Sequence, residues 1–364
     1  MPDKNLKPLD KQTTEEYIFK ELTALSEKVN NTLGMPEDLR ERLDQMLNRL
    51  NRMAKLGHYA AEFDTLSRYI DVVSMIPWDK KSEDILDLEA TKKVLDKNHF
   101  GLEDVKERML EYLATMILIK SRGGDAIAKS PVLLFVGLQG IGKTTLAMSI
   151  AEALGKKFIR IALGAIGSTL ELRGRSKVFP EAEPGQIIKA LMRTGVMNPV
   201  ILLDELEKSS GEHGLRSDVM ATLLEILDPN QSNEFRDHYI DFPVNLSQVL
   251  FICSANNTGN ISTALMDRME VIKMPSYTDA EKAVIARDYL LPKIIEKSGL
   301  REGELVIDPN LWPGIVRPFG FDSGIRSLGR TLDSICRKVA KEIVEGKTKQ
   351  VYLTAENLKY YLPK

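Results

Sequence analysis

The stretch Gly137-Leu-Gln-Gly-Ile-Gly142-Lys143-Thr144 decides how the chain folds, because it fits the pattern G-x-x-x-x-G-K-[ST]. It follows an apolar run, residues 132–136, and precedes a helical pattern, which is the context that makes the pattern informative. Glycines let backbone N–H groups wrap a phosphate chain, and the positive end of the following helix attracts negative charge. The sequence therefore predicts a phosphate loop, residues 137–144. The alternative is a glycine turn that only precedes the helix.

Two side chains of the phosphate loop have the chemistry to handle a nucleoside triphosphate. Lys143 would reach the β- and γ-phosphates, and the hydroxyl of Thr144 would ligate Mg²⁺. ATP or ADP together with Mg²⁺ are therefore the expected ligands. The residues predicted to bind them here are Gly137, Gln139, Gly140, Ile141, Gly142, Lys143, Thr144 and Thr145.

Outward from the loop, short apolar runs alternate with helical stretches. The runs are residues 132–136, 158–161, 200–203, 249–252 and 271–274. Such alternation predicts an α/β domain with a five-stranded parallel sheet, which we place at residues 95–276. The runs are continuously apolar rather than alternating, which is typical of strands buried on both faces.

Polar residues follow two of these predicted strands. Asp204 and Glu205 come directly after residues 200–203, at the edge where open α/β sheets bind ligands. Asp204 would hold Mg²⁺ through water, and Glu205 would polarise the attacking water as a general base. Asn256 closes the next apolar run and either orients that water or forms a turn at the end of the strand.

Helical patterns flank the sheet on both sides. Apolar residues recur at helical spacing in three stretches of residues 13–76, for example Leu39, Leu43, Met46, Leu50 and Met53. Residues 1–94 are therefore expected to form a helical neck, which either supports an oligomer or only packs and spaces. Residues 277–364 are expected to form a small helical domain that opens with a capping box at Thr278 and Glu281.

Composition excludes several classes of protein. The 364 residues are 43% hydrophobic with a net charge of −2, so neither wholesale disorder nor global attraction to nucleic acid or anionic lipid is expected. No apolar run reaches the roughly 18 residues of a membrane helix, and the start lacks the apolar core of a signal peptide. Cys253 and Cys336 lie far apart, which favours a reducing compartment: the cytoplasm, or the mitochondrial matrix in a eukaryote. The four histidines have no metal-binding spacing.

Further segments resemble the ATPase module of the Lon family of ATP-dependent proteases, within the AAA+ superfamily. They are Ile76-Pro-Trp-Asp-Lys-Lys-Ser-Glu-Asp84, Asn98-His-Phe-Gly-Leu-Glu-Asp-Val-Lys-Glu-Arg-Met-Leu-Glu-Tyr-Leu113, Leu202-Leu-Asp-Glu-Leu-Glu-Lys208, Leu224-Glu-Ile-Leu-Asp-Pro-Asn230, Leu265-Met-Asp-Arg-Met-Glu-Val-Ile272 and Ser323-Gly-Ile-Arg-Ser-Leu328. The resemblance implies an AAA+ P-loop NTPase fold between a helical neck and a small helical domain.

The resemblance also implies roles for individual residues. Phe100 and Gly101 match the segment that lines the adenine pocket, and Asn256 matches the sensor-1 position. Arg268 matches the arginine finger, which completes the site of a neighbouring subunit, and Arg326 matches the sensor-2 arginine. An arginine that acts in a neighbour requires a ring, so a homohexamer is implied, or a monomer when the module is isolated.

Phe179 and Pro180 align with the family's first pore loop, which grips unfolded polypeptide with an aromatic and then an aliphatic residue. Pro180 departs from this pattern, since it lacks an N–H group and has a fixed φ angle. The implied activity is ATP-driven unfolding and translocation of unfolded or damaged proteins. No segment resembles the family's peptidase nucleophile motif, so the chain is expected to be an excised part or a stand-alone relative without peptidase activity.

Two other functions stay open from the sequence. One is a nucleotide-binding scaffold or assembly element that does not thread polypeptide. The other is a nucleic-acid remodeller built on the same fold. The near-neutral charge argues against DNA as a partner, although Arg173, Arg175 and Lys177 form a small basic cluster beside the predicted pore loop.

Overall fold

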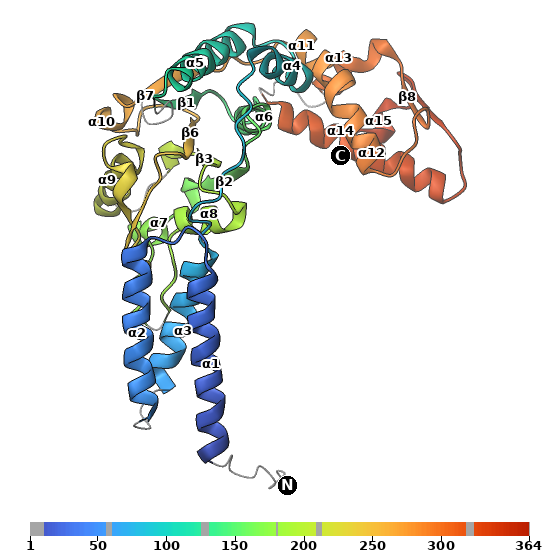
Figure 1. Ribbon diagram of the computed structural model, residues 1–364. Helices are drawn as coiled ribbons and strands as arrows, with labels where there is room; N and C mark the ends of the chain where they lie inside the picture. The colour runs from blue at the N-terminus through green and yellow to red at the C-terminus, as the bar shows by residue number, and fades with distance from the viewer. Residues whose placement is uncertain are drawn as a thin grey trace, which may run out of the picture. The chain divides into compact units, whose positions relative to one another are not determined.

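The computed structural model describes residues 11–55, 60–124, 131–179, 181–208, 213–317 and 324–363. The chain packs into two compact units, whose elements are labelled in Figure 1. One unit comprises residues 1–83, 165–201 and 209–250, and the other comprises residues 84–164, 202–208 and 251–364. The domain boundaries expected from the sequence, after residues 94 and 276, stay predictions.

A five-stranded parallel sheet carries the phosphate loop, which confirms the predicted fold class. Its strands are β1 (Val132–Val136), β2 (Phe158–Ala162), β3 (Val200–Asp204), β6 (Leu250–Ala255) and β7 (Met269–Lys273), in the order β2-β3-β6-β1-β7. In this register Leu134 of β1 lies opposite Cys253 of β6 and Val271 of β7. Because the strands are parallel, their carboxyl ends share one edge, where the phosphate loop begins.

The central strands are buried on both faces, as their continuous apolar sequence predicted. Every residue of β3 and β6 is buried, whereas the edge strands β2 and β7 are partly exposed. β6 continues beyond the predicted run through Cys253, Ser254 and Ala255, because these small side chains also fit inside the sheet. Asn256, the next residue, therefore lies at the carboxyl edge of the sheet.

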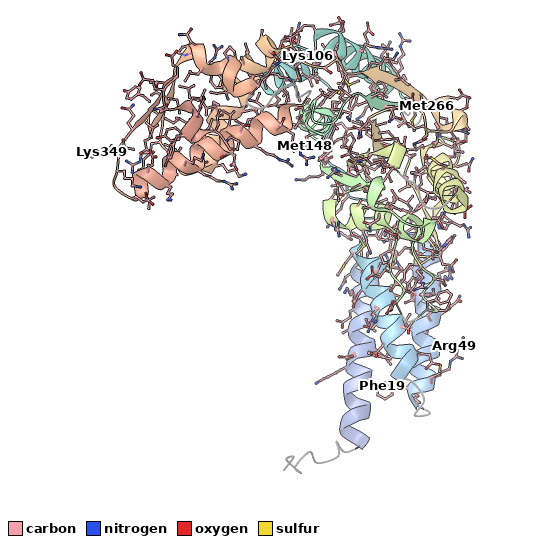
Figure 2. The ribbon with its side chains drawn as sticks, turned by 180° about the vertical axis from the view of Figure 1, so that it is seen from behind. Phe19, Arg49, Lys106, Met148, Met266 and Lys349 are labelled. Atoms are coloured by element: carbon pink, nitrogen blue, oxygen red, sulfur yellow. The ribbon has the colours of Figure 1, made fainter. Side chains whose placement is uncertain are left out.

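Helices α4 (Leu88–Asn98), α5 (Glu103–Ser121), α6 (Lys143–Ala153) and the short α10 (Thr263–Met266) belong to the same unit as the phosphate loop. Helix α5 packs against α4 and β7, and α6 packs against α4 and β2. Asp87 begins α4, since its side chain accepts from the N–H groups of Glu89 and Ala90. Lys106 of α5, labelled in Figure 2, is buried with its ammonium 2.7 Å from Asp96 of α4.

The predicted neck forms three helices, α1 (Lys11–Asn31), α2 (Glu37–Lys55) and α3 (Ala60–Met75), which lie side by side in Figure 1. Figure 2 labels Phe19 on α1 and Arg49 on α2. The buried stripe of α2 is Leu39, Leu43, Leu47, Leu50 and Ala54. Met46 and Met53 are only half-buried, which corrects the predicted stripe, because one face of a straight helix advances by 3.6 rather than 3.5 residues per turn.

The other elements of the first unit are α7 (Thr169–Arg173), α8 (Gln186–Thr194), α9 (His213–Leu227) and the hairpin of β4 (Phe235–Arg236) and β5 (Pro243–Val244). Asp237 in the hairpin is fully buried and accepts from the N–H groups of Gly185, Tyr239 and Ile240. The Tyr69 hydroxyl of α3 donates to Ile240 O at 2.6 Å, so the hairpin also contacts the neck.

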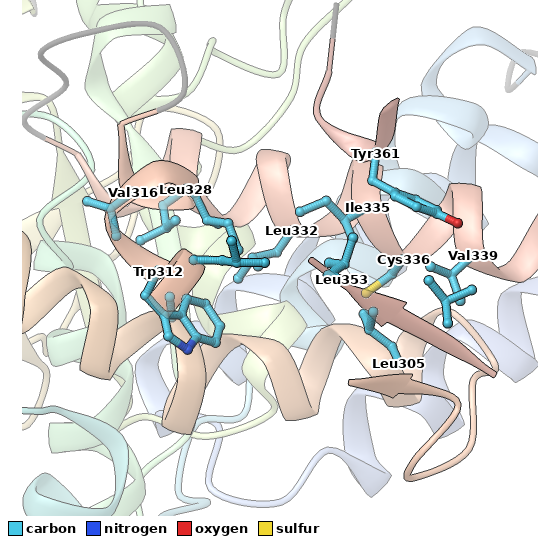
Figure 3. Close-up of a cluster of buried hydrophobic side chains, with 14 of the residues drawn as sticks. Leu305, Trp312, Val316, Leu328, Leu332, Ile335, Cys336, Val339, Leu353 and Tyr361 are labelled. Carbon is cyan, nitrogen blue, oxygen red and sulfur yellow. The ribbon is translucent and has the colours of Figure 1, made fainter. Parts of the chain in front are cut away.

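The C-terminal helical region contains α11 (Asp279–Val284), a π-helix (Ile285–Leu290), α12 (Leu291–Lys297), α13 (Trp312–Val316), α14 (Ile325–Val344) and α15 (Leu358–Tyr361). The capping box predicted at Thr278 and Glu281 is present. A parallel pair, β8 (Leu305–Ile307) and β9 (Val351–Leu353), was not predicted. Figure 3 shows the core of this region, in which α14 contributes Leu328, Leu332, Ile335, Cys336 and Val339.

Candidate functional site

The phosphate loop adopts a backbone that favours glycine. Gly140 has φ +83° and Gly142 has φ +103°, a region that residues with a Cβ rarely enter. A Cβ on Gly140 would also lie 3.3 Å from the Cβ of Arg326. Helix α6 begins at Lys143, so the N–H groups of its first turn have no partners within the helix and point toward the loop.

Lys143 is the central cation of the site. Its side chain donates to Gly137 O at 2.6 Å, Leu138 O at 3.0 Å and Asn256 Oδ1 at 3.0 Å, and only 9% of the residue is exposed. Burial lowers the pKa of this ammonium, while the neighbouring Asp204, Glu207 and Glu205 oppose that shift. A buried ammonium held by neutral oxygens is well placed to bind an anion.

Asp204 ends β3 beside the phosphate loop. Its carboxylate forms an ion pair with Arg160 of β2 at 2.5 Å and accepts hydrogen bonds from the Ser254 hydroxyl of β6 and the N–H of Glu205. Both oxygens of Asp204 are therefore engaged by protein groups. A Mg²⁺ ion held through water would compete with Arg160 for this carboxylate.

Glu205 is held in a strained backbone conformation, with φ +61°. A left-handed residue that has a Cβ costs roughly 1–2 kcal/mol, and such strain gathers at functional sites. Its carboxylate forms an ion pair with Lys208 at 2.9 Å and raises the pKa of that lysine. Among the described residues, Lys208 is the side chain that binds this carboxylate, and an ion pair with a half-exposed lysine exchanges readily with water.

Asn256 connects Lys143 to a residue that sequence reasoning missed. Its Nδ2 donates to Glu207 Oε1 at 2.6 Å, and its Oδ1 accepts from Lys143. Glu207 lies in a 3₁₀ turn, η2 (Leu206–Lys208), directly after the acidic pair. The turn alternative for Asn256 does not describe these contacts, because both of its polar atoms bind side chains.

These groups surround a cavity of about 670 Å³, within the usual range for ligand sites. The predicted residues that line it are Phe100, Gln139, Gly140, Ile141, Gly142, Lys143, Thr144, Thr145, Asp204, Glu205, Asn256 and Arg326. The C-terminal helical region adds Tyr277, Ile285, Tyr289 and Leu290. The rings of Phe100 and Tyr289 are 6.3 Å apart, so one end of the cavity is aromatic and apolar.

His99 forms part of the wall of this cavity, together with Met148 of α6, which is labelled in Figure 2. The imidazole Nε2 of His99 lies 2.9 Å from the Ser149 hydroxyl. Desolvation, with a smaller contribution from Lys106, lowers the pKa of His99 to about 4. The imidazole is therefore neutral at pH 7 and does not add charge to the pocket.

Arg326 reaches the cavity from the start of α14. The N–H of Ile325 donates to Gly140 O at 2.9 Å, so the beginning of α14 is tied to the phosphate loop by the backbone. The other predicted residues that the structure describes do not line the cavity. Gly101 and Gly137 are not among its lining residues, and Arg268 lies after α10, where it donates to Ala264 O at 3.0 Å.

Phe179 of the predicted pore loop belongs to the other unit. Phe179 is 51% exposed and lies at a turn, with the guanidinium of Arg175 at 5.3 Å from its ring centre. Pro180 lies outside the described residues. Of the basic cluster, Arg173 pairs with Glu225, and Lys177 packs 3.9 Å from the ring centre of Tyr69.

The residues that sequence reasoning missed carry weak local signals. Arg160 and Glu207 lie within segments that look like an ordinary strand and turn, and Tyr277 and Tyr289 are distant in sequence from the loop. The resemblance segment from 98 to 113 contains His99 and could have drawn attention to it.

The donor set fits a nucleoside triphosphate with Mg²⁺. The cavity joins an apolar aromatic end to glycine amides and Lys143, as adenine and phosphates require. Within the described residues no group of three or more acidic, histidine or cysteine side chains could hold a metal by itself. Mg²⁺ usually binds one or two protein oxygens plus phosphates, and the Thr144 hydroxyl and the Asp204 carboxylate are oxygens of that kind. No described helix is both long and apolar enough to cross a membrane.

Comparisons with known proteins agree with this geometry. Residues 133–276 match the family model described as the ATPase family associated with various cellular activities (AAA). Residues 296–352 match the Lon protease AAA+ ATPase lid domain. The first match contains the phosphate loop and the acidic pair, and the second contains α13, α14, β8 and the first two residues of β9.

Curated relatives are similar along most of the chain. The Lon protease of Halothermothrix orenii is 43% identical over 330 residues, covering 91% of this chain and 41% of the relative. Lon protease 1 of Bacillus subtilis is 42% identical, covering 94% and 43%, and Lon protease 2 of Thermus thermophilus is 38% identical, covering 97% and 46%. The chain thus spans about two fifths of the length of the curated relatives it matches. It is an ATPase module of the Lon family, an AAA domain followed by a Lon lid domain.

Proposed function

We propose that the chain is an ATP-hydrolysing AAA+ motor that unfolds and translocates polypeptides, the ATPase part of a Lon-like ATP-dependent protease. The observation that carries the proposal is the cavity in which the phosphate loop, Asp204, Glu205 and Asn256 meet Arg326. The relatives named Lon protease support a polypeptide as the substrate.

The proposed chemistry divides between the loop and the acidic pair. Backbone N–H groups of the phosphate loop and Lys143 bind the phosphates, and Glu205 takes a proton from the attacking water. Thr144 and Asp204 would hold Mg²⁺, which neutralises phosphate charge when it is bound. For Glu205 to act, its carboxylate leaves Lys208, an exchange that costs little because Lys208 is half-exposed.

Arg326 is proposed to report γ-phosphate occupancy to the C-terminal helical region. Arg326 directly follows Ile325, whose N–H donates a hydrogen bond to Gly140 O. A movement of the start of α14 should therefore also move the phosphate loop. Phe179 is proposed to grip polypeptide, and its exposed ring supports that role. Pro180 would make the grip stiffer.

Arg268 is proposed to complete the site of a neighbouring copy in a homohexamer, because it does not line the cavity of its own chain. An isolated module that stays monomeric should hydrolyse ATP slowly, since it lacks this arginine. The proposed compartment is the cytoplasm, or the mitochondrial matrix in a eukaryote.

Nucleic-acid remodelling is the weaker alternative. Arg173 and Lys177 are engaged within the protein by Glu225 and Tyr69, so the basic cluster offers little free charge for phosphates. No contact among the described residues specifically supports a nucleotide-binding scaffold that does not thread polypeptide.

Three measurements on the full chain test the proposal. Phosphate release with ATP and Mg²⁺ tests hydrolysis, and solution mass with a slowly hydrolysed ATP analogue tests ring formation. Loss of fluorescence from a folded fluorescent protein with an unstructured tail tests unfolding. ATP-dependent loss of fluorescence supports a motor. Hydrolysis by an assembled ring without any loss of fluorescence would rule out unfolding.

A further inference from the structure

Three side chains form a hydrogen-bonded chain that ends at the phosphate loop. Asn256 Nδ2 donates to Glu207 Oε1 at 2.6 Å, and Lys143 Nζ donates to Asn256 Oδ1 at 3.0 Å. A carboxylate only accepts hydrogen bonds, and an ammonium only donates them. The amide of Asn256 therefore has a single orientation that satisfies both neighbours, with its NH₂ group toward Glu207 and its oxygen toward Lys143.

Glu207 is fixed in place by burial. The residue is 5% exposed, and it lies in the 3₁₀ turn that directly follows β3. Its second oxygen, Oε2, is buried and has no hydrogen-bond partner among the described residues. A buried carboxylate oxygen without a partner lowers stability, so packing alone does not favour an acid at this position. Groups that are unfavourable for folding are expected at functional sites.

We propose that Glu207 is a positioning residue that fixes the amide of Asn256, so that a hydrogen-bond acceptor faces the phosphate loop. This inference rests on the proposed ATPase function. A carbonyl oxygen has two lone pairs, so Asn256 Oδ1 holds Lys143 and the attacking water together. Glu207 does not line the cavity, so its proposed effect on the water passes through Asn256, beside the direct effect of its charge on Lys143.

The step that this arrangement serves is balanced without further reactants. Asn256 Oδ1 accepts a hydrogen bond from one O–H of the water, and Glu205 removes the other proton. The water oxygen forms a bond to the γ-phosphorus, and the bond from that phosphorus to the β–γ bridging oxygen breaks. ADP leaves with the electron pair, and the proton on Glu205 passes to solvent.

Reversing the hydrogen bond tests the inference. In Asn256→Asp, two carboxylates face each other at hydrogen-bond distance and repel. When Glu207→Gln is added, the glutamine NH₂ donates to the aspartate, the total charge of the pair returns to the parent value, and an oxygen again faces Lys143. Asn257→Asp is the matched control, since it adds the same charge at the next residue, which is exposed and outside the hydrogen-bonded chain.

The readouts are kcat and KM for ATP and the midpoint of thermal unfolding. Asn256→Asp should lower kcat at least about 100-fold relative to the parent. The kcat of the double variant should be at least about tenfold higher than that of Asn256→Asp. In both variants KM should change less than kcat. Asn257→Asp should stay close to the parent. Asn256→Asp should also unfold at a lower temperature than both the parent and the double variant.

Two results would overturn the inference: parent-like kcat in Asn256→Asp, or a double variant that is no faster than Asn256→Asp although it folds like the parent. A parent chain that does not hydrolyse ATP is a different result, because it refutes the proposed function. The unfolding midpoints would still test the hydrogen-bond reversal in that case, and an unrecovered midpoint in the double variant would count against it.

Discussion

Replacing Lys143 with methionine removes the central cation while keeping most of its volume. In this structure the ammonium makes three hydrogen bonds, to Gly137 O, Leu138 O and Asn256 Oδ1. We expect two of these donors to turn to phosphate oxygens when ATP binds. A hydrogen bond to a charged group contributes about 1.5–3 kcal/mol, so losing two weakens binding by about 3–6 kcal/mol. That corresponds to a dissociation constant roughly 10²–10⁴-fold larger.

Folding should change much less than binding. The methionine removes a buried charge, whose desolvation opposes folding, and the carbonyl oxygens that it releases face the cavity, where water reaches them. Titration calorimetry with a slowly hydrolysed ATP analogue and Mg²⁺ measures the affinity, and thermal unfolding measures stability. Lys349→Met, at an exposed lysine labelled in Figure 2, is the control for loss of one positive charge. Unchanged affinity in a folded Lys143→Met variant would refute the assignment of Lys143.

Three further predictions concern other parts of the site. Glu205→Gln should still bind ATP but hydrolyse it at least about 100-fold more slowly, and phosphate release near the parent rate would exclude Glu205 as the base. Gly140→Ala and Gly195→Ala both place a Cβ at positive φ and should each lower the unfolding free energy by roughly 1–2 kcal/mol. Only Gly140→Ala should also weaken ATP binding. Equal ATP affinity of the two variants would contradict the loop geometry. Because the folded pKa of His99 lies near 4 and the unfolded value near 6.5, its stabilising contribution is complete above pH 6.5 and is lost as the pH falls toward 4, by up to about 3 kcal/mol. Denaturant titrations of the parent and of His99→Gln between pH 7 and 4 isolate this change. Burial raises the pKa of Asp237 to about 6, but Asp237 contributes equally to both proteins. Identical pH profiles of the two proteins would contradict the prediction.

The parts of the fold that follow from short-range sequence were predictable. The phosphate loop needs a fixed glycine and lysine spacing, and β3 and β6 are continuous apolar runs, so each is visible within about ten residues. The predicted stripe of α2 was partly wrong, because Leu47 and Ala54 fit the same period nearly as well as Met46 and Met53.

Long-range contacts were not visible in the sequence. The pairing of β8 with β9 joins residues more than 40 positions apart, and each strand has only three residues. The local sequence around Glu207 is typical of a surface acid in a helical turn. Its hydrogen-bond partner, Asn256, follows β6 and is distant in the sequence. Arg160 lies in β2, whereas Asp204, with which it forms an ion pair, ends β3. The local sequence around Arg160 therefore does not reveal this contact.

The proposed function requires that a triphosphate binds between the phosphate loop and α14. The most direct test is a crystal structure of the full chain grown with Mg²⁺ and a slowly hydrolysed ATP analogue. We predict that the γ-phosphate lies within hydrogen-bond distance of Lys143 and Arg326, with the adenine beside Phe100 and Tyr289. Crystals in which the analogue binds elsewhere, or in which Lys143 keeps its three protein partners in the presence of saturating analogue, would contradict the claim.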